Sequence, residues 1–155
     1  MSIITTYNIK YVIDVRRFPS SRKFPHFNRQ YLQEELAKKN IRYVWLGLFL
    51  GGKRGYVPGA EKFTCFKAQG YRNYVALMNT DEWKRAFNIL KIIVRKGTTV
   101  ILCAERLPWR CHRKLISDAL IAEDFEVIHI IDTDRIIPHK LTSCARIIDG
   151  KLTYL

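Results

Sequence analysis

Short apolar runs alternate with helix-like segments along most of this chain, and that alternation restricts the fold more than any other feature. The predicted strands are Tyr11–Val15, Arg42–Leu46, Thr98–Cys103 and Glu126–Ile131. In the segments between them, apolar residues recur every three or four positions, which is the spacing of an amphipathic helix. The predicted helices are Arg29–Lys39, Asp81–Arg95 and Cys111–Glu123. Because strands that alternate with helices form βαβ units, we predict a three-layer α/β fold whose mainly parallel sheet has helices on both faces.

The end of the chain predicts a β-hairpin instead of a further βαβ unit. Asp149-Gly150 lies between two β-like runs within Arg146–Thr153, and this dipeptide favours a two-residue turn. The chain has 155 residues, 48% of them hydrophobic, which is the size of one ordinary domain. We therefore predict a single domain over residues 1–155, with a core over 1–131 and a C-terminal tail over 132–155. The irregular segment Gly47–Tyr74 is long enough to predict a functional loop.

The chain is strongly basic, with 27 Lys and Arg residues against 14 Asp and Glu residues and a formal net charge of +13. A charge of this size predicts attraction to phosphate groups or nucleic acid. No apolar run reaches the roughly 18 residues of a membrane span. The first residues, Met1–Lys10, lack the pattern of a signal peptide. We expect a cytoplasmic protein with an anionic ligand and no membrane partner.

The four cysteines are Cys65, Cys103, Cys111 and Cys144. Without a secretion signal they predict reduced thiols, and zinc binding is the usual alternative in the cytosol. Cys103 and Cys111 lack the close C-x-x-C pairing of structural zinc sites, although His112 adjoins Cys111. We therefore expect no metal and no cofactor.

Reactive and basic side chains follow the predicted strands at the points where the strands end. They are Asp14, Arg16 and Arg17 after the first strand, Gly51 and Gly52 after the second, and Cys103, Glu105, Cys111, His112 and Arg113 after the third. Ligands of parallel α/β sheets bind outside the carboxyl ends of the strands, and glycines let a backbone approach a ligand closely. The sequence therefore predicts a basic, glycine-lined pocket for a phosphate-bearing ligand such as a nucleotide.

Within this pocket we expect Arg16, Arg113 and the N-terminus of the following helix to hold the anion. A thiol among cations can lose its proton readily, so Cys103 is a candidate nucleophile, but a cysteine that closes a strand is more often a core residue. Glu105 is a candidate general acid or base beside His112, or else it fixes Arg113 by an ion pair. Asp14 is either a ligand-binding carboxylate or the structural partner of Arg16. Whether the pocket is catalytic or inert stays open.

A second class of function rests on Arg16–Arg29, where cations, aromatic residues and prolines alternate. Single-stranded nucleic acids bind such surfaces, because bases stack on the rings and phosphates meet the cations. The alternative function is therefore a non-catalytic nucleic-acid-binding module that uses Arg16–Arg29 and Lys53–Arg72. Against it, we favour the interpretation that Phe18, Phe24 and Phe27 anchor this loop in the core.

Several of these motifs occur together, in the same order, in one known family. They are Asp14-Val-Arg16 with Pro19 and Phe27, Leu46-Gly47 with Gly51-Gly52, Leu102-Cys-Ala-Glu105, Cys111-His-Arg113 and Val127-Ile-His129. In these motifs the chain resembles the family called domain of unknown function DUF488. The family has no agreed activity, so the resemblance implies an α/β fold and a shared strand-end site instead of a reaction. The characteristic positions it implies are Asp14, Arg16, Cys103, Glu105, Cys111, His112 and Arg113.

Family members also have one more strand and a helix before the strand that carries Asp14. The resemblance implies that here this strand is missing, or that the tail hairpin or a partner chain supplies the edge of the sheet. An uncovered edge invites pairing with another chain, so we expect association into a homo-oligomer.

Overall fold

The computed structural model describes residues 2–20, 25–52 and 55–154. The chain divides into two compact units. Unit 1 comprises Met1–Gly51 and Arg85–Ala104, and unit 2 comprises Gly52–Lys84 and Glu105–Leu155. Each unit is described by itself, and the single domain over residues 1–155 stays a prediction.

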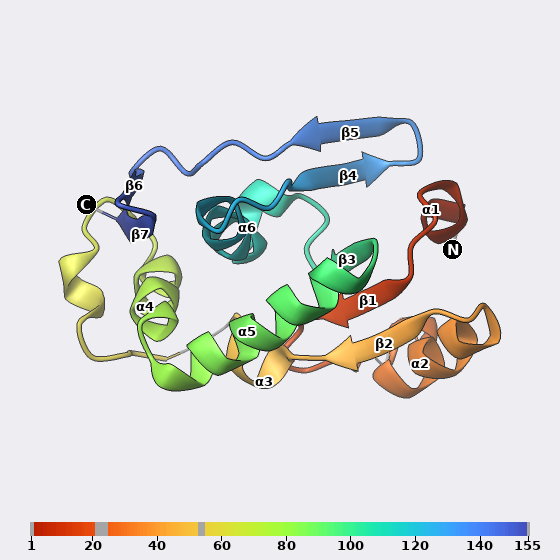
Figure 1. Ribbon diagram of the computed structural model, residues 1–155. Helices are drawn as coiled ribbons and strands as arrows, with labels where there is room; N and C mark the ends of the chain where they lie inside the picture. Colours follow the sequence, from red (N-terminus) through yellow and green to blue (C-terminus); the bar gives the residue numbers. More distant parts are fainter. Residues whose placement is uncertain (1, 21–24, 53–54, 155) are drawn as a thin grey trace. The chain divides into compact units, whose positions relative to one another are not determined.

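Unit 1 contains a three-stranded parallel sheet with the strand order β2-β1-β3 (Figure 1). The strands are β1 (Tyr11–Asp14), β2 (Arg42–Trp45) and β3 (Thr99–Leu102). Asp14 pairs with Trp45 on one side and with Leu102 on the other, so all three strands end at the same level. The α/β class and the parallel sheet are thus confirmed, with strand ends close to those predicted.

Two crossover helices place layers on both faces of this sheet. The helix α2 (Arg29–Lys38) connects β1 to β2, and α5 (Asp81–Lys96), most of which belongs to unit 1, leads into β3. The chain steps from β1 outward to β2 and then returns past β1 to β3. Because such crossovers are right-handed, this reversal of direction puts α2 and α5 on opposite faces, as in Figure 1.

The face under α2 is held by an apolar cluster. Leu32 and Leu36 lie four residues apart on α2 and pack with Val12 of β1. The short helix α1 (Ser2–Thr6) contributes partly buried isoleucines to the same cluster. On the other face, Ile13 is fully buried. Burial of this kind on both faces explains why the strands read as continuous apolar runs.

Unit 2 is built from helices and two antiparallel strand pairs. Its elements are η2 (Ala60–Lys62), α4 (Gln69–Met78), η3 (Pro108–Arg110), α6 (Arg113–Ala122), β4 (Ile128–Asp132), β5 (Arg135–Pro138), β6 (Ala145–Ile148) and β7 (Lys151–Tyr154). The strand predicted at Glu126–Ile131 corresponds to β4, but β4 pairs antiparallel with β5. Only Thr133 and Asp134 connect these two strands, and a connection this short allows only an antiparallel partner.

The C-terminal hairpin is confirmed. Strands β6 and β7 pair antiparallel, with Ile148 opposite Lys151. Asp149 has φ 51° and Gly150 has φ 75°, so both turn residues occupy the left-handed region that a type I′ turn requires. The dipeptide alone predicts this turn correctly because its geometry is set locally.

The predicted loop Gly47–Tyr74 is more regular than expected. It contains α3 (Gly47–Leu50) and η2, and α4 begins inside it at Gln69. Six consecutive residues of α4, Asn73–Met78, are buried. Gly70 lies in the first turn of this helix, and glycine is a signal for loops, which is why the sequence pattern missed the start of the helix. Among the described residues, the structure contains no helix with the length and apolar character of a membrane span.

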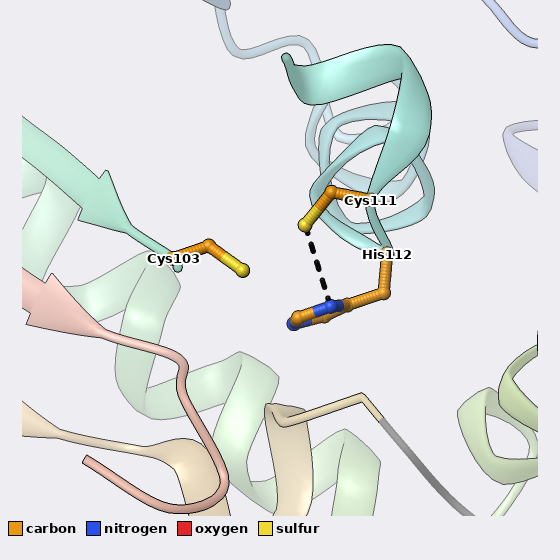
Figure 2. Close-up of side chains that lie close together, drawn as sticks. All are labelled: Cys103, Cys111 and His112. Atoms are coloured by element: carbon orange, nitrogen blue, oxygen red, sulfur yellow. Dashed lines mark hydrogen bonds between the residues drawn. The ribbon is translucent and has the colours of Figure 1, made fainter. Parts of the chain in front are cut away.

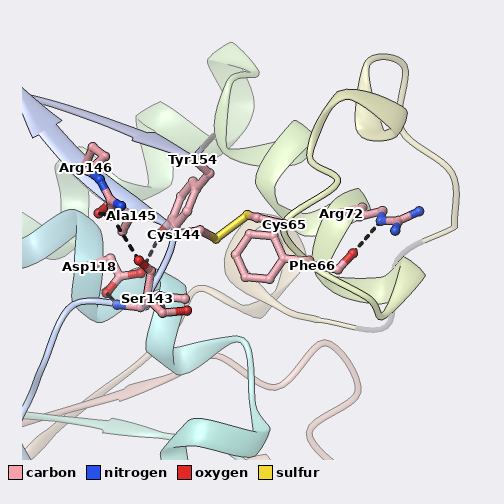
Figure 3. The surroundings of a disulfide bond; sticks show 10 residues. Cys65, Phe66, Arg72, Asp118, Ser143, Cys144, Ala145, Arg146 and Tyr154 are labelled. Carbon is pink, nitrogen blue, oxygen red and sulfur yellow. Dashed lines mark hydrogen bonds between the residues drawn. A yellow bond between two sulfur atoms is a disulfide. The ribbon is translucent and has the colours of Figure 1, made fainter.

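Cys65 and Cys144 form a disulfide bond within unit 2, although they lie 79 residues apart in the sequence (Figure 3). Their Cα atoms are 6.2 Å apart, within the range that a disulfide spans. The expectation that all four cysteines are reduced is therefore wrong for this pair. The fold of unit 2 brings the two residues together, and sequence spacing carries no information on that approach.

Candidate functional site

Asp14 and Arg16 form an ion pair at the end of β1. The Arg16 Nε atom donates to Oδ1 of Asp14 at 2.9 Å, and Nη2 donates to Oδ2 at 2.7 Å. Tyr43 also donates its hydroxyl to Oδ2, at 2.5 Å. Burial and this bond to Asp14 raise the pKa of Tyr43. Asp14 is thus the structural partner of Arg16. The Nε and Nη2 atoms of Arg16 are already hydrogen-bonded to its carboxylate.

The segments that follow β1 and β2 lie against each other in unit 1. Trp45 donates from Nε1 to the carbonyl of Arg16 at 2.7 Å, and Arg17 donates to the carbonyl of Leu48 at 3.3 Å. A Cβ atom added at Gly51 would lie 2.8 Å from the Cβ atom of Arg17. Gly51 is therefore required for packing against Arg17, and its role toward a ligand stays a prediction.

Cys103 directly follows β3 in unit 1 and is half-buried. Its position at a strand end agrees with the sequence analysis. Its role as a nucleophile stays a prediction, because a cysteine at this position is more often a core residue.

Cys111 and His112 lie side by side at the start of α6 in unit 2 (Figure 2). The Sγ atom of buried Cys111 lies 3.5 Å from Nδ1 of His112. A Cβ atom added at Gly52 would lie 2.8 Å from the same Nδ1 atom, so a larger residue there would displace the imidazole. Three of the predicted site residues, Gly52, Cys111 and His112, are therefore neighbours within unit 2.

The backbone amides of the first turn of α6 already have acceptors. The amide of Arg113 donates to the sulfur of Cys111 at 3.4 Å. The amide of Lys114 donates to the Cys111 carbonyl at 3.2 Å, and that of Leu115 donates to the His112 carbonyl at 2.9 Å. An anion at this helix end would therefore have to be held by side chains, whereas the sequence analysis relied also on the amides.

Arg113 and Glu105 are joined, but not by the expected ion pair. The Nη2 atom of Arg113 donates to the backbone carbonyl of Glu105. The Glu105 carboxylate instead accepts the backbone amide of Leu107 at 3.2 Å. The ion-pair interpretation of Glu105 is therefore wrong. The sequence shows that Glu105 and Arg113 are eight positions apart. It does not show whether the carboxylate or the backbone carbonyl of Glu105 faces the guanidinium.

Unit 2 also contains a cavity of about 320 Å³ beside the start of α6. The volume is at the lower end of the range of small-molecule sites, about 300–1,000 Å³. The lining residues are Trp109, Lys114, His129, Ile137, Pro138, His139, Lys140 and Thr142. Lys114 lies with its ammonium 3.9 Å from the ring centre of Tyr71, and burial lowers the pKa of Lys114. The cavity thus combines two lysines and two histidines with apolar and aromatic walls.

A chain of buried hydrogen bonds leads from α6 to this cavity. Asp118 is fully buried on α6, and its Oδ1 atom lies 2.7 Å from Nε2 of His139. His139 Nδ1 in turn lies 2.7 Å from Nε2 of His129. Tyr154, at the end of β7, donates its hydroxyl to Oδ2 of Asp118 at 2.7 Å (Figure 3). We call Asp118, His139 and His129 the relay.

The surroundings of His129 keep its imidazole uncharged at neutral pH. Burial, the neighbouring His139 ring and the charge of Arg113 lower the pKa of His129 to about 4, although Asp118 acts in the opposite direction. A neutral imidazole has one nitrogen with a hydrogen and one with a lone pair. His129 therefore has a lone pair on one ring nitrogen at physiological pH, although it is a weaker base than an ordinary imidazole.

One comparison with known proteins gives a result. Residues 2–120 match the model of a family described as Domain of unknown function DUF488. The chain belongs to this family. No curated protein and no solved structure matches the chain. The DUF488 match contains every site residue that the sequence analysis proposed, and Asp118 as well. The other members of the relay and Tyr154 lie beyond the matched residues.

The relay was missed by sequence reasoning, which noted His129 only as part of a DUF488 motif. Asp118 reads as one polar residue within a buried helix, and His139 follows a short strand that the pattern did not predict. The one available signal is that a buried acid in the apolar run Leu115–Leu120 requires a partner. That signal does not say where the partner lies.

Proposed function

We propose that this DUF488 protein binds a small phosphate-bearing ligand, such as a nucleotide, in the cavity of unit 2. The observation that carries the proposal is that Lys114 and Lys140 both line one cavity that also has an aromatic wall. Lysine ammonium groups bind phosphate as point charges. Trp109 is 49% exposed, so its ring is available to stack on a flat apolar group. A net charge of +13 draws anions toward the protein.

The cavity supports this proposal better than the predicted ligand residues of unit 1. Arg16 is bound in two places to Asp14, and its side chain is only 10% exposed. Lys114 forms no ion pair among the described residues, and its ammonium rests on the Tyr71 ring. A phosphate therefore gains a cation at Lys114 without having to displace a carboxylate.

Replacing Lys114 with methionine should weaken phosphate binding at least about tenfold, because a hydrogen bond to a charged group contributes about 1.5–3 kcal/mol and each 1.4 kcal/mol is a factor of ten. Isothermal titration of the folded protein with inorganic phosphate and with a nucleoside monophosphate measures the affinity. Lys151→Met, an exposed lysine of β7 outside the cavity lining, is the matched control and should leave the affinity unchanged. Equal affinities in Lys114→Met and the parent protein would contradict the proposal, as would a parent protein that binds neither probe.

One observation favours the nucleic-acid-binding alternative. Phe18 and Phe27 are 69% and 45% exposed, so the interpretation that they anchor the loop in the core is wrong for both. The Arg17 guanidinium lies 5.6 Å from the ring centre of Phe18. A ring with a cation beside it is the arrangement that binds a stacked base and its phosphate. Other parts of this prediction, Phe24 and Lys53 among them, lie outside the described residues.

If this surface binds single strands, Phe18→Ala should lower the affinity for a fluorescent oligothymidine about five- to tenfold, because base stacking contributes about 1–3 kcal/mol. Fluorescence anisotropy measures the affinity, and binding should weaken steeply with salt. Ile148→Ala is the control, since Ile148 is 53% exposed on β6, outside this surface. Absence of binding even in dilute buffer would exclude the alternative.

We also propose that the protein associates into a homo-oligomer. This proposal is supported by the described sheet of unit 1, in which β2 and β3 are edge strands. Edge strands offer backbone groups to a partner strand. Sedimentation equilibrium tests it directly, since a mass of one chain would contradict it.

A further inference from the structure

We propose that the relay ends in the cavity of unit 2 and makes His129 the general base for hydrolysis of a phosphate ester. The inference rests on the proposed function for its substrate. It adds the class of reaction and the residue that accepts the proton. The family match ends at residue 120, before His129 and His139, and a family described as of unknown function gives neither residue a role.

With Asp118 ionised and His139 neutral, the hydrogen bonds of the relay all run in one direction. The Oδ1 atom of Asp118 also accepts the backbone amide of Thr142, at 3.1 Å. An ionised carboxylate has no hydrogen to donate, so Nε2 of His139 must donate to it. In a neutral His139 ring, Nδ1 is then an acceptor, and Nε2 of His129 donates to it. The remaining nitrogen of His129, Nδ1, therefore has a lone pair.

That lone pair is available to a ligand. His129 and His139 both line the cavity. Among the described residues, Nδ1 of His129 makes no hydrogen bond. The buried side-chain atoms without a hydrogen-bond partner in the described part of the chain are Nε2 of His112 and Nε of Arg113, so Nδ1 of His129 is not one of them. A water molecule between this nitrogen and a phosphate held by Lys114 would be in position for deprotonation.

The reaction can be balanced with the groups present. The oxygen of the water forms a bond to phosphorus while its proton moves to Nδ1 of His129. The proton on Nε2 of His129 moves to Nδ1 of His139. The bond between phosphorus and the ester oxygen breaks, and the leaving group keeps that electron pair and takes up a proton from solvent. His139 later returns its proton through His129 to solvent.

The relay explains how a weakly basic imidazole can serve as the base. A positive charge on His129 would be poorly stabilised, because burial, the neighbouring His139 ring and Arg113 all disfavour it. After the second proton transfer the charge instead resides on His139, in contact with the Asp118 carboxylate. Asp118 and His139 are thus positioning residues, and His129 is the catalytic residue.

The test uses the full chain and p-nitrophenyl phosphate, whose leaving group departs as a stable phenolate and needs no acid. His129→Asn should lower kcat at least 100-fold, since general base catalysis contributes about 10²–10⁴-fold. Its affinity for inorganic phosphate should change less than twofold. Asp124→Asn, at an exposed residue of unit 2 outside the cavity lining, is the control and should hydrolyse the ester at the parent rate.

The outcomes separate this inference from the proposed function. Two results would overturn the relay while the binding proposal stands. In the first, the parent protein binds phosphate but does not hydrolyse the ester. In the second, the parent protein binds phosphate and His129→Asn hydrolyses the ester as fast as the parent protein does. If the parent protein binds neither inorganic phosphate nor the nucleoside monophosphate and does not hydrolyse the ester, the binding proposal fails and the relay fails with it.

A second measurement does not depend on the substrate. Long-range ¹H–¹⁵N spectra at pH 7 should show His129 protonated only on Nε2. A hydrogen on Nδ1 would make His129 a donor and overturn the inference. The Asp118 carboxylate raises the pKa of His129, so its loss in the folded Asp118→Asn variant should lower that pKa further. The acidic limb of the pH–rate profile should therefore move to lower pH. A merely structural role of Asp118 would leave that limb in place.

Discussion

Replacement of Asp118 by alanine is expected to lower the free energy of unfolding by about 3–5 kcal/mol, the usual cost of breaking a buried charge pair. The carboxylate accepts hydrogen bonds from His139, from the amide of Thr142 and from the hydroxyl of Tyr154. Its loss leaves these donors without their acceptor in a region closed to water. The pKa of Tyr154 is raised by burial and by Asp118, so its hydroxyl stays protonated and still requires an acceptor.

Urea unfolding followed by circular dichroism measures this effect. Asp124→Asn is the control, because Asp124 is exposed and has φ 67°, a conformation that asparagine tolerates. Its stability should stay within about 0.5 kcal/mol of the parent protein, as is usual for surface changes. A loss below about 1 kcal/mol in Asp118→Ala would mean that the three donors find water.

Replacement of Gly47 by alanine should lower the free energy of unfolding by about 3 kcal/mol, at the upper end of the usual cost of overpacking. A Cβ atom at this position would lie 1.9 Å from the carbonyl oxygen of Arg16 and 2.4 Å from Nε1 of Trp45. The first of these atoms belongs to the backbone and cannot move away without disturbing the end of β1. Trp45 would also lose its hydrogen bond to the same carbonyl.

Tryptophan fluorescence and urea unfolding report this change. Gly70→Ala is the matched control, because nothing lies within 4 Å of a Cβ atom at Gly70, which lies in α4. Alanine is favoured over glycine inside a helix by about 0.5–1 kcal/mol, so this variant should be slightly more stable. Similar stabilities of the two variants would show that the approach of Arg16 to Gly47 is not tight in solution.

The parts of the fold that follow from local patterns could be predicted from the sequence. Strands β1, β2 and β3 are short apolar runs, and α2 and α5 have the period of amphipathic helices. The turn at Asp149-Gly150 is likewise local. The partner of β4 was not predictable from its own residues, because its apolar run is compatible with a parallel sheet and with a hairpin.

The candidate site divides in the same way. Asp14 and Arg16 are two residues apart on one strand end, so their ion pair could be anticipated as one of two interpretations. The relay joins Asp118, His129 and His139, which belong to different elements and share no spacing motif. Their association depends on how α6 packs in unit 2, and that information is distributed over many buried apolar contacts.

The disulfide between Cys65 and Cys144 has a topological consequence for unit 2. It closes a ring that contains the whole chain from residue 66 to residue 143, with α4, α6, β4 and β5 inside it. A protease that cuts this ring once would leave a single covalent molecule, with both fragments released only by a reductant. The last hairpin, which supplies Tyr154 to Asp118, would thus stay tethered to its site even after the backbone had been nicked.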